Sequence, residues 1–353
     1  MRSEPARDSS TPSATHRRRF LQLFAMAAVA GRTLLRSGDA RAAVDAAREA
    51  ATDAPWPSMA RRTLGRTGWN ASRLVFGCGA ALSRQRRDDL LDAALAAGID
   101  VFDVGFRGYY HDAEKNLAPF LKRHRDAIHL ISKAMPDPDL EAGASLSASR
   151  RAELARTWSQ RLDESLVELG VERVDAYYLM AANNVELVAS DELRSTFERA
   201  KAAGKVEHLG LSTHENAERV LAAAAAAGHY SLAQIAITPA GWYDWADKGI
   251  LAGTRPMAEL RATLDRAREA GIGLIGMKAG RYLAGRKFLG WGKPDAFDAH
   301  YDAAFLASGL SPYQRSYAYV LGHGLDAVNA DMQSFAHLRE NVEAAVGADI
   351  WFA

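Results

Sequence analysis

Short apolar segments and segments with a helical hydrophobic period alternate without a break from residue 74 to residue 345. The apolar segments have the length and composition of buried parallel strands, and the segments between them carry apolar residues on one helical face. We expect strands at residues 74–78, 99–103, 127–132, 174–179, 206–211, 232–237, 272–277 and 327–330. Helices are expected at residues 86–97, 112–123, 148–169, 190–203, 217–227, 257–270, 311–322 and 335–345. Eight such units predict a closed α/β TIM barrel, (β/α)8, and no GxGxxG motif supports a Rossmann fold.

The segments that flank this repeat predict how the barrel is framed. Gly65, Gly68 and Asn70 separate two short strands, so we predict an N-terminal β-hairpin that leads into the first barrel strand. The predicted division is a linker over residues 44–60, the barrel over 61–347 and a tail over 348–353. Long aromatic loops follow the sixth and seventh strands, and loops of this length at the C-terminal face of a barrel often cover a binding site.

Residues 1–43 have the features of an export signal. Arg17 and Arg18 precede a short, moderately apolar run at residues 21–31, and Ala40-Arg41-Ala42 has the pattern of a cleavage site. The order and spacing resemble a twin-arginine (Tat) signal, which implies the Tat export machinery as a partner and a periplasmic location. The run is too short to span a bilayer. The alternative is a basic amphipathic helix that is retained, in which case the protein is cytoplasmic.

The charge balance and the cysteine count exclude several classes of function. The net charge is +1, which gives no support to nucleic-acid binding. Cys78 is the only cysteine, so an intramolecular disulfide, a cysteine-ligated iron–sulfur cluster and a Cys₄ zinc site are all excluded. No set of His and carboxylate residues gathers at the expected strand ends, and we therefore predict no metal site.

Three polar residue types are expected to meet after the second and third strands. Asp103 and Lys133 stand at the C-terminal ends of these strands, and Tyr109 and Tyr110 lie on the loop between them. Parallel strands bring such ends to one rim, where Lys133 could lower the pKa of a phenol and Asp103 could hold the ammonium. The alternative is a surface ion pair with two aromatic loop residues.

Seven segments spread along the barrel carry a resemblance to a known family. They are TLGRTGWNASRLVFGCG, AGIDVFDVG with YYHDAEKNL, the strand that ends in Ser132-Lys133, SLVELGVERVDAYYL, KVEHLGLSTHE, GIGLIGMK and MQSFAHLREN. In this order they resemble the aldo-keto reductases over nearly the whole of residues 61–346. The resemblance implies a (β/α)8 fold and hydride transfer between a nicotinamide dinucleotide and a small-molecule carbonyl substrate.

The resemblance also implies roles for individual residues. Asp103 and Lys133 match the family's paired aspartate and lysine. Tyr110 matches the proton-donating tyrosine because it stands four residues before Glu114 in a YxxxE pattern. The loop between Asp103 and Tyr110 is two residues longer than the family's, so Tyr109 could take the role instead.

Met180 stands where the family has a histidine that orients the substrate carbonyl. A thioether donates no hydrogen bond, so the donor must come from elsewhere, with Asn183, Asn184 and His111 as candidates. Trp242 is a further candidate for the wall of the substrate pocket. Three outcomes stay open: a carbonyl reductase with a substitute donor, a reductase for another substrate class such as activated C=C bonds, and a non-catalytic barrel that binds a ligand or partner.

The resemblance assigns the cofactor to one set of residues. Ser212, Thr213 and Gln234 match positions that hold the nicotinamide carboxamide, and Met277 with Lys278 matches the strand-seven position against which the ring packs. The residues that match the adenine-side motif are Gln333, Ser334 and Asn341. Gln333 stands where many members have Arg, which weakens the expected hold on a 2′-phosphate, although Arg339 could reach it. NAD and NADP therefore both remain open.

Overall fold

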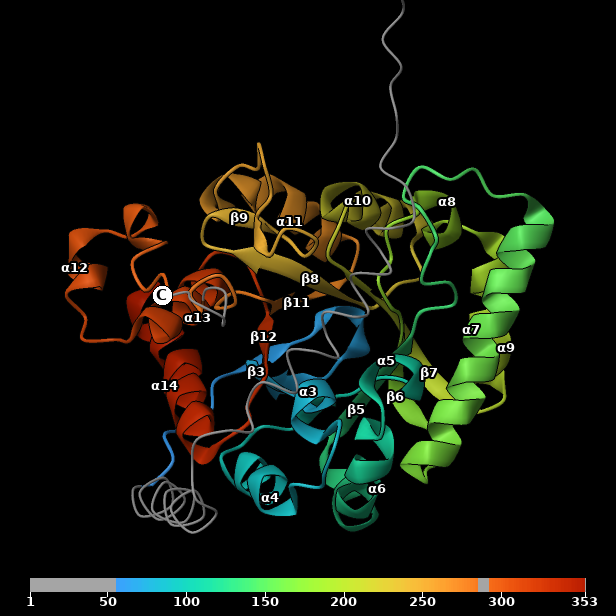
Figure 1. The fold of residues 1–353 in the computed structure, drawn as a ribbon, viewed down its shortest axis with the longest axis horizontal. Coiled ribbons are helices and arrows are strands. Elements are labelled where there is room, and N and C mark those ends of the chain that lie inside the picture. The colour runs from blue at the N-terminus through green and yellow to red at the C-terminus, as the bar shows by residue number, and fades with distance from the viewer. Residues whose placement is uncertain (1–54, 285–291, 353) are drawn as a thin grey trace, which may run out of the picture. The chain divides into compact units, whose positions relative to one another are not determined.

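The predicted barrel is present in the computed structural model, which describes residues 55–284 and 292–352. Eight parallel strands in the described residues pair in the order β8-β11-β12-β3-β4-β5-β6-β7, and β7 pairs with β8 to close the ring. Figure 1 shows these strands at the centre of the molecule with helices around them. The strands are β3 (Leu74–Gly77), β4 (Val101–Asp103), β5 (His129–Ala134), β6 (Val174–Leu179), β7 (Val206–Thr213), β8 (Leu232–Thr238), β11 (Gly273–Met277) and β12 (Ala327–Ala330).

The helices that cover the barrel are α4 (Asp88–Ala96), α6 (Ala113–His124), α7 (Ala148–Leu169), α9 (Asp191–Ala202), α10 (Ala217–Ala227), α11 (Arg261–Glu269), α13 (Pro312–Gly322) and α14 (Phe335–Trp351). Short helices lie between them: α3 (Cys78–Leu82), α5 (Arg107–Tyr110), α8 (Val185–Val188), α12 (Ala303–Leu306), and the 3₁₀ turns η1 (Gly65–Thr67), η2 (Arg125–Ala127), η3 (Met257–Leu260) and η4 (Asp298–His300). Helices α7 and α9 pack side by side, and so do α13 and α14 (Figure 1).

Local sequence signals explain where the helices begin and end. The Ser147 side chain accepts a hydrogen bond from the Arg150 amide at the start of α7, and Gly170 ends that helix in the left-handed conformation with φ 65°. Helix α13 begins with a capping box in which Ser311 and Gln314 each satisfy the other's backbone amide. These signals are encoded locally, so the predicted bounds of α7 match the observed ones.

The N-terminal hairpin lies at the N-terminal end of the barrel. It consists of β1 (Arg61–Thr63) and β2 (Asn70–Ser72), which pair antiparallel as predicted. Leu64, Trp69 and Ala71 pack with interior residues of the barrel strands in one buried cluster. The Arg66 guanidinium donates to the backbone carbonyls of Gly228 and Ala270, which lie just after α10 and α11. The hairpin therefore leaves the opposite, C-terminal end of the strands for a site.

Apart from shifts of a few residues at several bounds, such as β5, which begins at His129 and not at residue 127, three departures from the expected elements stand out. Cys78 begins the short helix α3 instead of ending a strand. The aromatic segment after β8 forms a second hairpin of β9 (Gly241–Asp244) and β10 (Gly249–Ile250), which extends β8 antiparallel. Helix α14 continues to Trp351 and so includes part of the predicted tail.

The predicted Tat signal in residues 1–43 lies outside the described residues, as does most of the predicted linker. Within the described residues, no helix combines the length and the apolar character that crossing a bilayer requires.

Candidate functional site

The C-terminal ends of β4 and β5 bring Asp103 and Lys133 into a buried ion pair. Lys133 Nζ lies 2.6 Å from each Asp103 carboxylate oxygen and 2.6 Å from the backbone carbonyl oxygen of Val104. Both side chains are only 4% exposed. An ammonium has three N–H donors, and these three acceptors can use all of them. The two predicted partners therefore meet, in a charge pair that is held in a single geometry.

Asn329 extends this pair across the barrel to β8 and β11. Its side-chain amide on β12 donates to an Asp103 oxygen at 2.6 Å and to the Gln234 Oε1 at 3.1 Å. The Gln234 amide in turn lies 3.5 Å from the Met277 sulfur. Gly77 makes room for this arrangement, because a Cβ there would lie 2.7 Å from the Asn329 Oδ1. Asn329 stands at the C-terminal end of the last predicted strand, but it was not among the predicted site residues.

The Tyr110 ring is held between two glycines beside Lys133. A Cβ at Gly79 would lie 2.4 Å from Tyr110 Cε1, and one at Gly105 would lie 2.8 Å from its Cδ2. The Lys133 ammonium lies 5.4 Å from the centroid of the Tyr110 ring. Tyr109 contacts Tyr110 edge-on, with ring centroids 4.7 Å apart. The predicted phenol, ammonium and carboxylate are therefore neighbours, with Tyr110 fixed by close backbone contacts.

The pKa of Tyr110 shifts in the direction opposite to the expected one. Burial raises the pKa of this phenol well above its ordinary value, and Tyr109, Asp103 and Asp331 raise it further. The expected lowering by Lys133 is absent because the ammonium charge is balanced by Asp103 and its donors are already used. Tyr110 therefore stays protonated at physiological pH, as a proton donor must.

The glycine contact gives a specific test of this geometry. Replacing Gly79 with Ala is expected to displace the Tyr110 ring, because the new methyl group would overlap it. Overpacking of this kind costs about 1–3 kcal/mol of unfolding free energy. A phenol moved by about 1 Å costs roughly 10²-fold in turnover. Urea unfolding and steady-state kinetics measure both effects.

Gly143→Ala is the matched control for this substitution. Gly143 is exposed, and a Cβ there would meet no atom within 4 Å. Its stability and turnover should equal those of the unchanged protein. Wild-type turnover by Gly79→Ala would show that the Tyr110 position does not matter.

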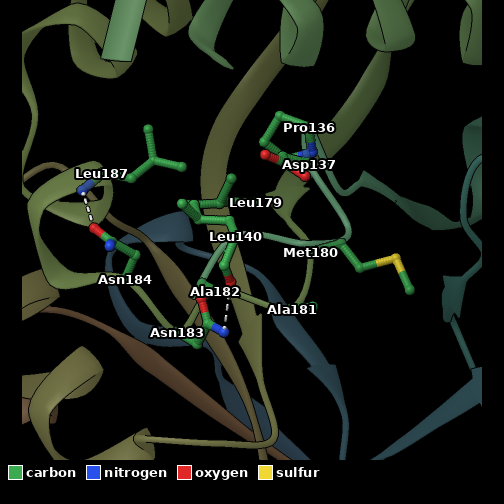
Figure 2. Close-up of a pocket in the computed structure, with 10 residues that line it drawn as sticks. All are labelled: Pro136, Asp137, Leu140, Leu179, Met180, Ala181, Ala182, Asn183, Asn184 and Leu187. Atoms are coloured by element: carbon green, nitrogen blue, oxygen red, sulfur yellow. Dashed lines mark hydrogen bonds between the residues drawn. The ribbon is translucent and has the colours of Figure 1, made fainter. Parts of the chain in front are cut away.

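Met180 follows β6 and is buried, with 4% of its surface exposed. It borders a cavity of about 10 Å³ together with Asn183 and Asn184. Figure 2 shows the Met180 thioether directed away from both amides. The Asn183 Nδ2 donates to Leu140 O at 3.1 Å, and the Asn184 Oδ1 caps α8 by accepting from the Leu187 amide at 3.1 Å. These contacts argue against Asn183 or Asn184 as the substitute donor.

Two other predicted pocket residues also have structural surroundings. His111 is exposed and ends α5 with a left-handed φ of 55°. Trp242 is 4% exposed and packs in the main core, and its indole N–H has no hydrogen-bond partner in the described part of the chain. Neither residue is held against Lys133 by a direct contact.

The predicted nicotinamide-binding residues differ in whether their side-chain hydrogen-bond donors are already engaged. The Ser212 hydroxyl accepts from the Ala181 amide at 3.4 Å, which leaves its own proton available. The Thr213 hydroxyl donates to the backbone carbonyl of Glu215 at 2.6 Å and is therefore occupied. Met277 is 6% exposed at the end of β11 and offers an apolar surface. The strand ends thus provide a face for a flat ring and one free hydroxyl donor, with Gln234 held by Asn329.

The predicted adenine-side residues lie at the start of α14. Ser334 caps this helix by accepting from the His337 amide at 3.2 Å, and Asn341 is buried. The exposed Gln333 side chain donates to Asp331 at 2.9 Å. The basic residue beside it is Arg87, which donates to the Gln333 carbonyl at 3.2 Å.

Arg339, the basic residue predicted to reach a 2′-phosphate, is engaged elsewhere. Its guanidinium lies 4.4 Å from the centroid of the Trp56 ring and donates to the Pro55 carbonyl at 3.2 Å. The loop after β11 adds Arg281, whose guanidinium has no hydrogen bond or ion pair with the described residues. An apolar face and an unpaired cation at the end of β11, with a hydroxyl donor at the end of β7 on the other side of β8, fit a nicotinamide dinucleotide.

Other chemistries find less support in the described residues. There, no three His, Cys, Asp or Glu side chains gather closely enough to hold a metal ion. Cys78 is fully buried, and burial with the nearby Asp103 charge raises the pKa of its thiol. This thiol is therefore a packing group and a poor nucleophile.

Comparison with known proteins identifies the same fold. The model of the aldo/keto reductase family matches residues 73–277, which is more than half of the chain. No curated protein matches the chain. Among solved structures, a protein assigned as an aldo-keto reductase from Pseudomonas aeruginosa is 21% identical, covers 82% of this chain and 94% of its own, and superposes with a TM-score of 0.56. The aldo-keto reductase from Klebsiella pneumoniae in complex with NADPH is 20% identical, with 82% and 90% covered and a TM-score of 0.57.

Proposed function

The chain belongs to the aldo/keto reductase family, and on that premise we propose that it is a nicotinamide-dependent oxidoreductase that reduces a carbonyl substrate. The buried Lys133–Asp103 pair beside Tyr110 is the observation that carries this proposal. A buried ion pair often stabilises a fold less than apolar residues of the same size would, so its presence at the strand ends favours a role in catalysis. Related structures of the family were solved with NADPH and with NADP and acetate.

In this mechanism the chain's own residues position the substrate and supply one proton. A reduced nicotinamide, when bound, would supply the hydride for the carbonyl carbon. Tyr110 gives its phenolic proton to the carbonyl oxygen, so that one hydride and one proton complete the alcohol. The phenolate that remains lies beside the Lys133 ammonium, 5.4 Å from Nζ to the ring centroid, and is reprotonated from solvent. Asp103 keeps that ammonium in place.

The residues that would hold the cofactor are Met277 against the ring, Ser212 at the carboxamide and Arg281 at the phosphates. Gln333 and Arg87 lie at the adenine side, and Arg87 offers the cation that a 2′-phosphate requires. We therefore propose binding of NADPH or NADH, with the preference to be read from their two affinities.

Cofactor binding and turnover can be measured directly. Titration of the full-length protein with NADPH and with NADH, followed by cofactor fluorescence, is expected to show saturable binding. A panel of aldehydes and ketones should then oxidise the bound cofactor, with KM values between about 1 μM and 1 mM. Absence of any binding by either dinucleotide would reject the proposal.

A non-catalytic, ligand-binding barrel is the second candidate function. Met180 favours this function, because a thioether has no hydrogen-bond donor with which to orient a carbonyl. Removing such a donor from an active site lowers the rate on the order of 10²–10³-fold. Dinucleotide binding without turnover of any carbonyl compound would favour this second function.

We also propose export through the Tat route, on the strength of Arg17 and Arg18 in the predicted signal. Cell fractionation tests it: a variant with both arginines changed to Lys should stay in the cytoplasm, while the unchanged protein is exported. Equal distributions would contradict export by this route.

A further inference from the structure

A cluster of four side chains at the C-terminal face of the barrel is not used by the mechanism above. We call it the lysine–tryptophan cluster, and it consists of His214, Trp245, Lys248 and Lys278. His214 and Lys278 follow the ends of β7 and β11, the two strands that flank β8. Trp245 and Lys248 lie in the β9–β10 hairpin that continues β8. The cluster is therefore built from three adjacent strand ends.

The Trp245 ring is the centre of this cluster. The Lys248 ammonium lies 3.2 Å from a centroid of the indole, and the Lys278 ammonium lies 4.4 Å from it. The His214 ring centroid is 5.4 Å away. Cation–π contacts hold a lysine near a ring but leave its N–H donors available to another acceptor.

The Lys278 ammonium and the His214 imidazole have unused hydrogen-bond donors, whereas Lys248 uses one. Lys248 donates to the Trp245 carbonyl at 2.5 Å. The Lys278 ammonium has only its ring contact, and no hydrogen bond or ion pair joins this side chain to the described residues. The same holds for His214, apart from its contact with Trp245. Asp331 and Asp103 act on the Lys278 ammonium through their charge, but neither forms an ion pair with it in the described residues. A half-buried ammonium without a direct anionic partner is costly, so its presence suggests a ligand that supplies the partner.

The cluster lies at the same C-terminal end of the barrel as the Lys133–Asp103 pair. The charge of Lys133 acts on both His214 and Lys278, and that of Asp103 acts on Lys278. Burial lowers the pKa of His214 well below its ordinary value, so the imidazole is neutral and offers one N–H donor. Lys278 also adopts a left-handed φ of 67°, which is uncommon for a residue other than Gly and is often found at functional sites.

We infer that Lys278, assisted by His214, binds a carboxylate of the substrate, so that the protein acts on carbonyl compounds that carry a carboxylate group. This inference rests on the proposed reductase function. The cofactor phosphates have a separate unpaired cation in Arg281, which leaves Lys278 for the substrate. A carboxylate accepts from an ammonium and an imidazole N–H at once, and such charge-assisted bonds are the strong ones.

Two matched pairs of substrates test the assignment. They are 4-carboxybenzaldehyde with its methyl ester, and phenylglyoxylate with its methyl ester, which differ in charge and bracket two spacings of carbonyl and carboxylate. Wild-type kcat/KM is expected to be higher for at least one acid than for its ester. In Lys278→Met the ratio of kcat/KM for the acid to that for the ester should fall about 10- to 100-fold.

The control variant is Lys122→Met, which removes an exposed lysine from α6 and should leave the acid-to-ester ratio unchanged. An unchanged ratio in Lys278→Met would overturn the inference. Equal losses for acid and ester, together with weaker NADPH binding by fluorescence, would show that Lys278 holds a cofactor phosphate and would also overturn it.

The pH profile provides a second readout. The pKa of Lys278 is lowered to about 8, chiefly by burial. The charged groups that face it are Asp331, Arg281, Lys133, Asp103 and Lys248. The ammonium form exists below this pKa, so kcat/KM for the acid should fall as the pH rises through about 8. The ester should lack this decline, and Lys278→Met should abolish it for the acid.

A binding measurement separates failure of this inference from failure of the proposed function. If wild-type protein turns over neither acid nor ester, the reductase function fails. Calorimetric titration of 4-carboxybenzaldehyde into the full-length protein then still reports on Lys278. Binding that weakens about tenfold or more in Lys278→Met supports the carboxylate site. Equal or absent binding in both proteins rejects it.

Discussion

Replacing Tyr110 with Phe is expected to lower kcat/KM for carbonyl reduction about 10²- to 10⁴-fold, which is the contribution of a positioned general acid. The Phe ring keeps the packing between Gly79 and Gly105 and loses only the hydroxyl. Stability and cofactor affinity should therefore stay close to those of the unchanged protein. Steady-state kinetics, urea unfolding and NADPH fluorescence measure the three quantities.

Tyr109→Phe is the matched control for that experiment, because its ring contacts Tyr110 edge-on and it is the alternative acid. Burial raises the pKa of Tyr109 to about 12, so both phenols stay protonated at neutral pH. If Tyr109→Phe loses turnover and Tyr110→Phe keeps it, the assignment of the acid is reversed. Because the pKa of Tyr110 is raised, this phenol should not ionise below the ordinary phenol pKa of about 10. The rate of reduction should therefore show no decline from Tyr110 ionisation below that pH.

The barrel was predictable because its signals are local and repeated. Buried parallel strands are apolar throughout, and each is followed by a helix with one apolar face, so the alternation itself predicts the fold. Asp103 and Lys133 were predictable for the same reason, since the ends of neighbouring parallel strands must share one rim.

The parts that sequence reasoning missed depend on contacts between distant segments. Asn329 reaches Asp103 only because β12 and β4 both flank β3, and because Gly77 leaves room for the amide. The β9–β10 hairpin was missed because its aromatic residues also fit a loop. The direction of the Tyr110 pKa shift was missed because it depends on which acceptors use the donors of Lys133.

Replacing Asp103 with Asn is expected to lower the free energy of unfolding by about 3–5 kcal/mol, the cost of leaving a buried charge without its partner. The Lys133 ammonium would keep one side-chain carbonyl, and the new amide N–H groups would face donors of Lys133 and Asn329. Turnover should also be lost, because the ammonium beside Tyr110 is no longer held. Urea unfolding with a constant m-value measures the change in stability.

The exposed pair of Lys205 and Asp163 is the matched control, since its atoms lie 2.7 Å apart but both side chains are at least 39% exposed. Asp163→Asn should cost less than about 1 kcal/mol, because solvent screens that pair. The double variant Asp103→Asn with Lys133→Met removes both buried charges. Its loss of unfolding free energy should therefore be smaller, by about 0.5–3 kcal/mol, than the summed losses of the two single variants. Additive effects would mean that the pair is not coupled, and the buried ammonium could then no longer be assigned a position set by Asp103.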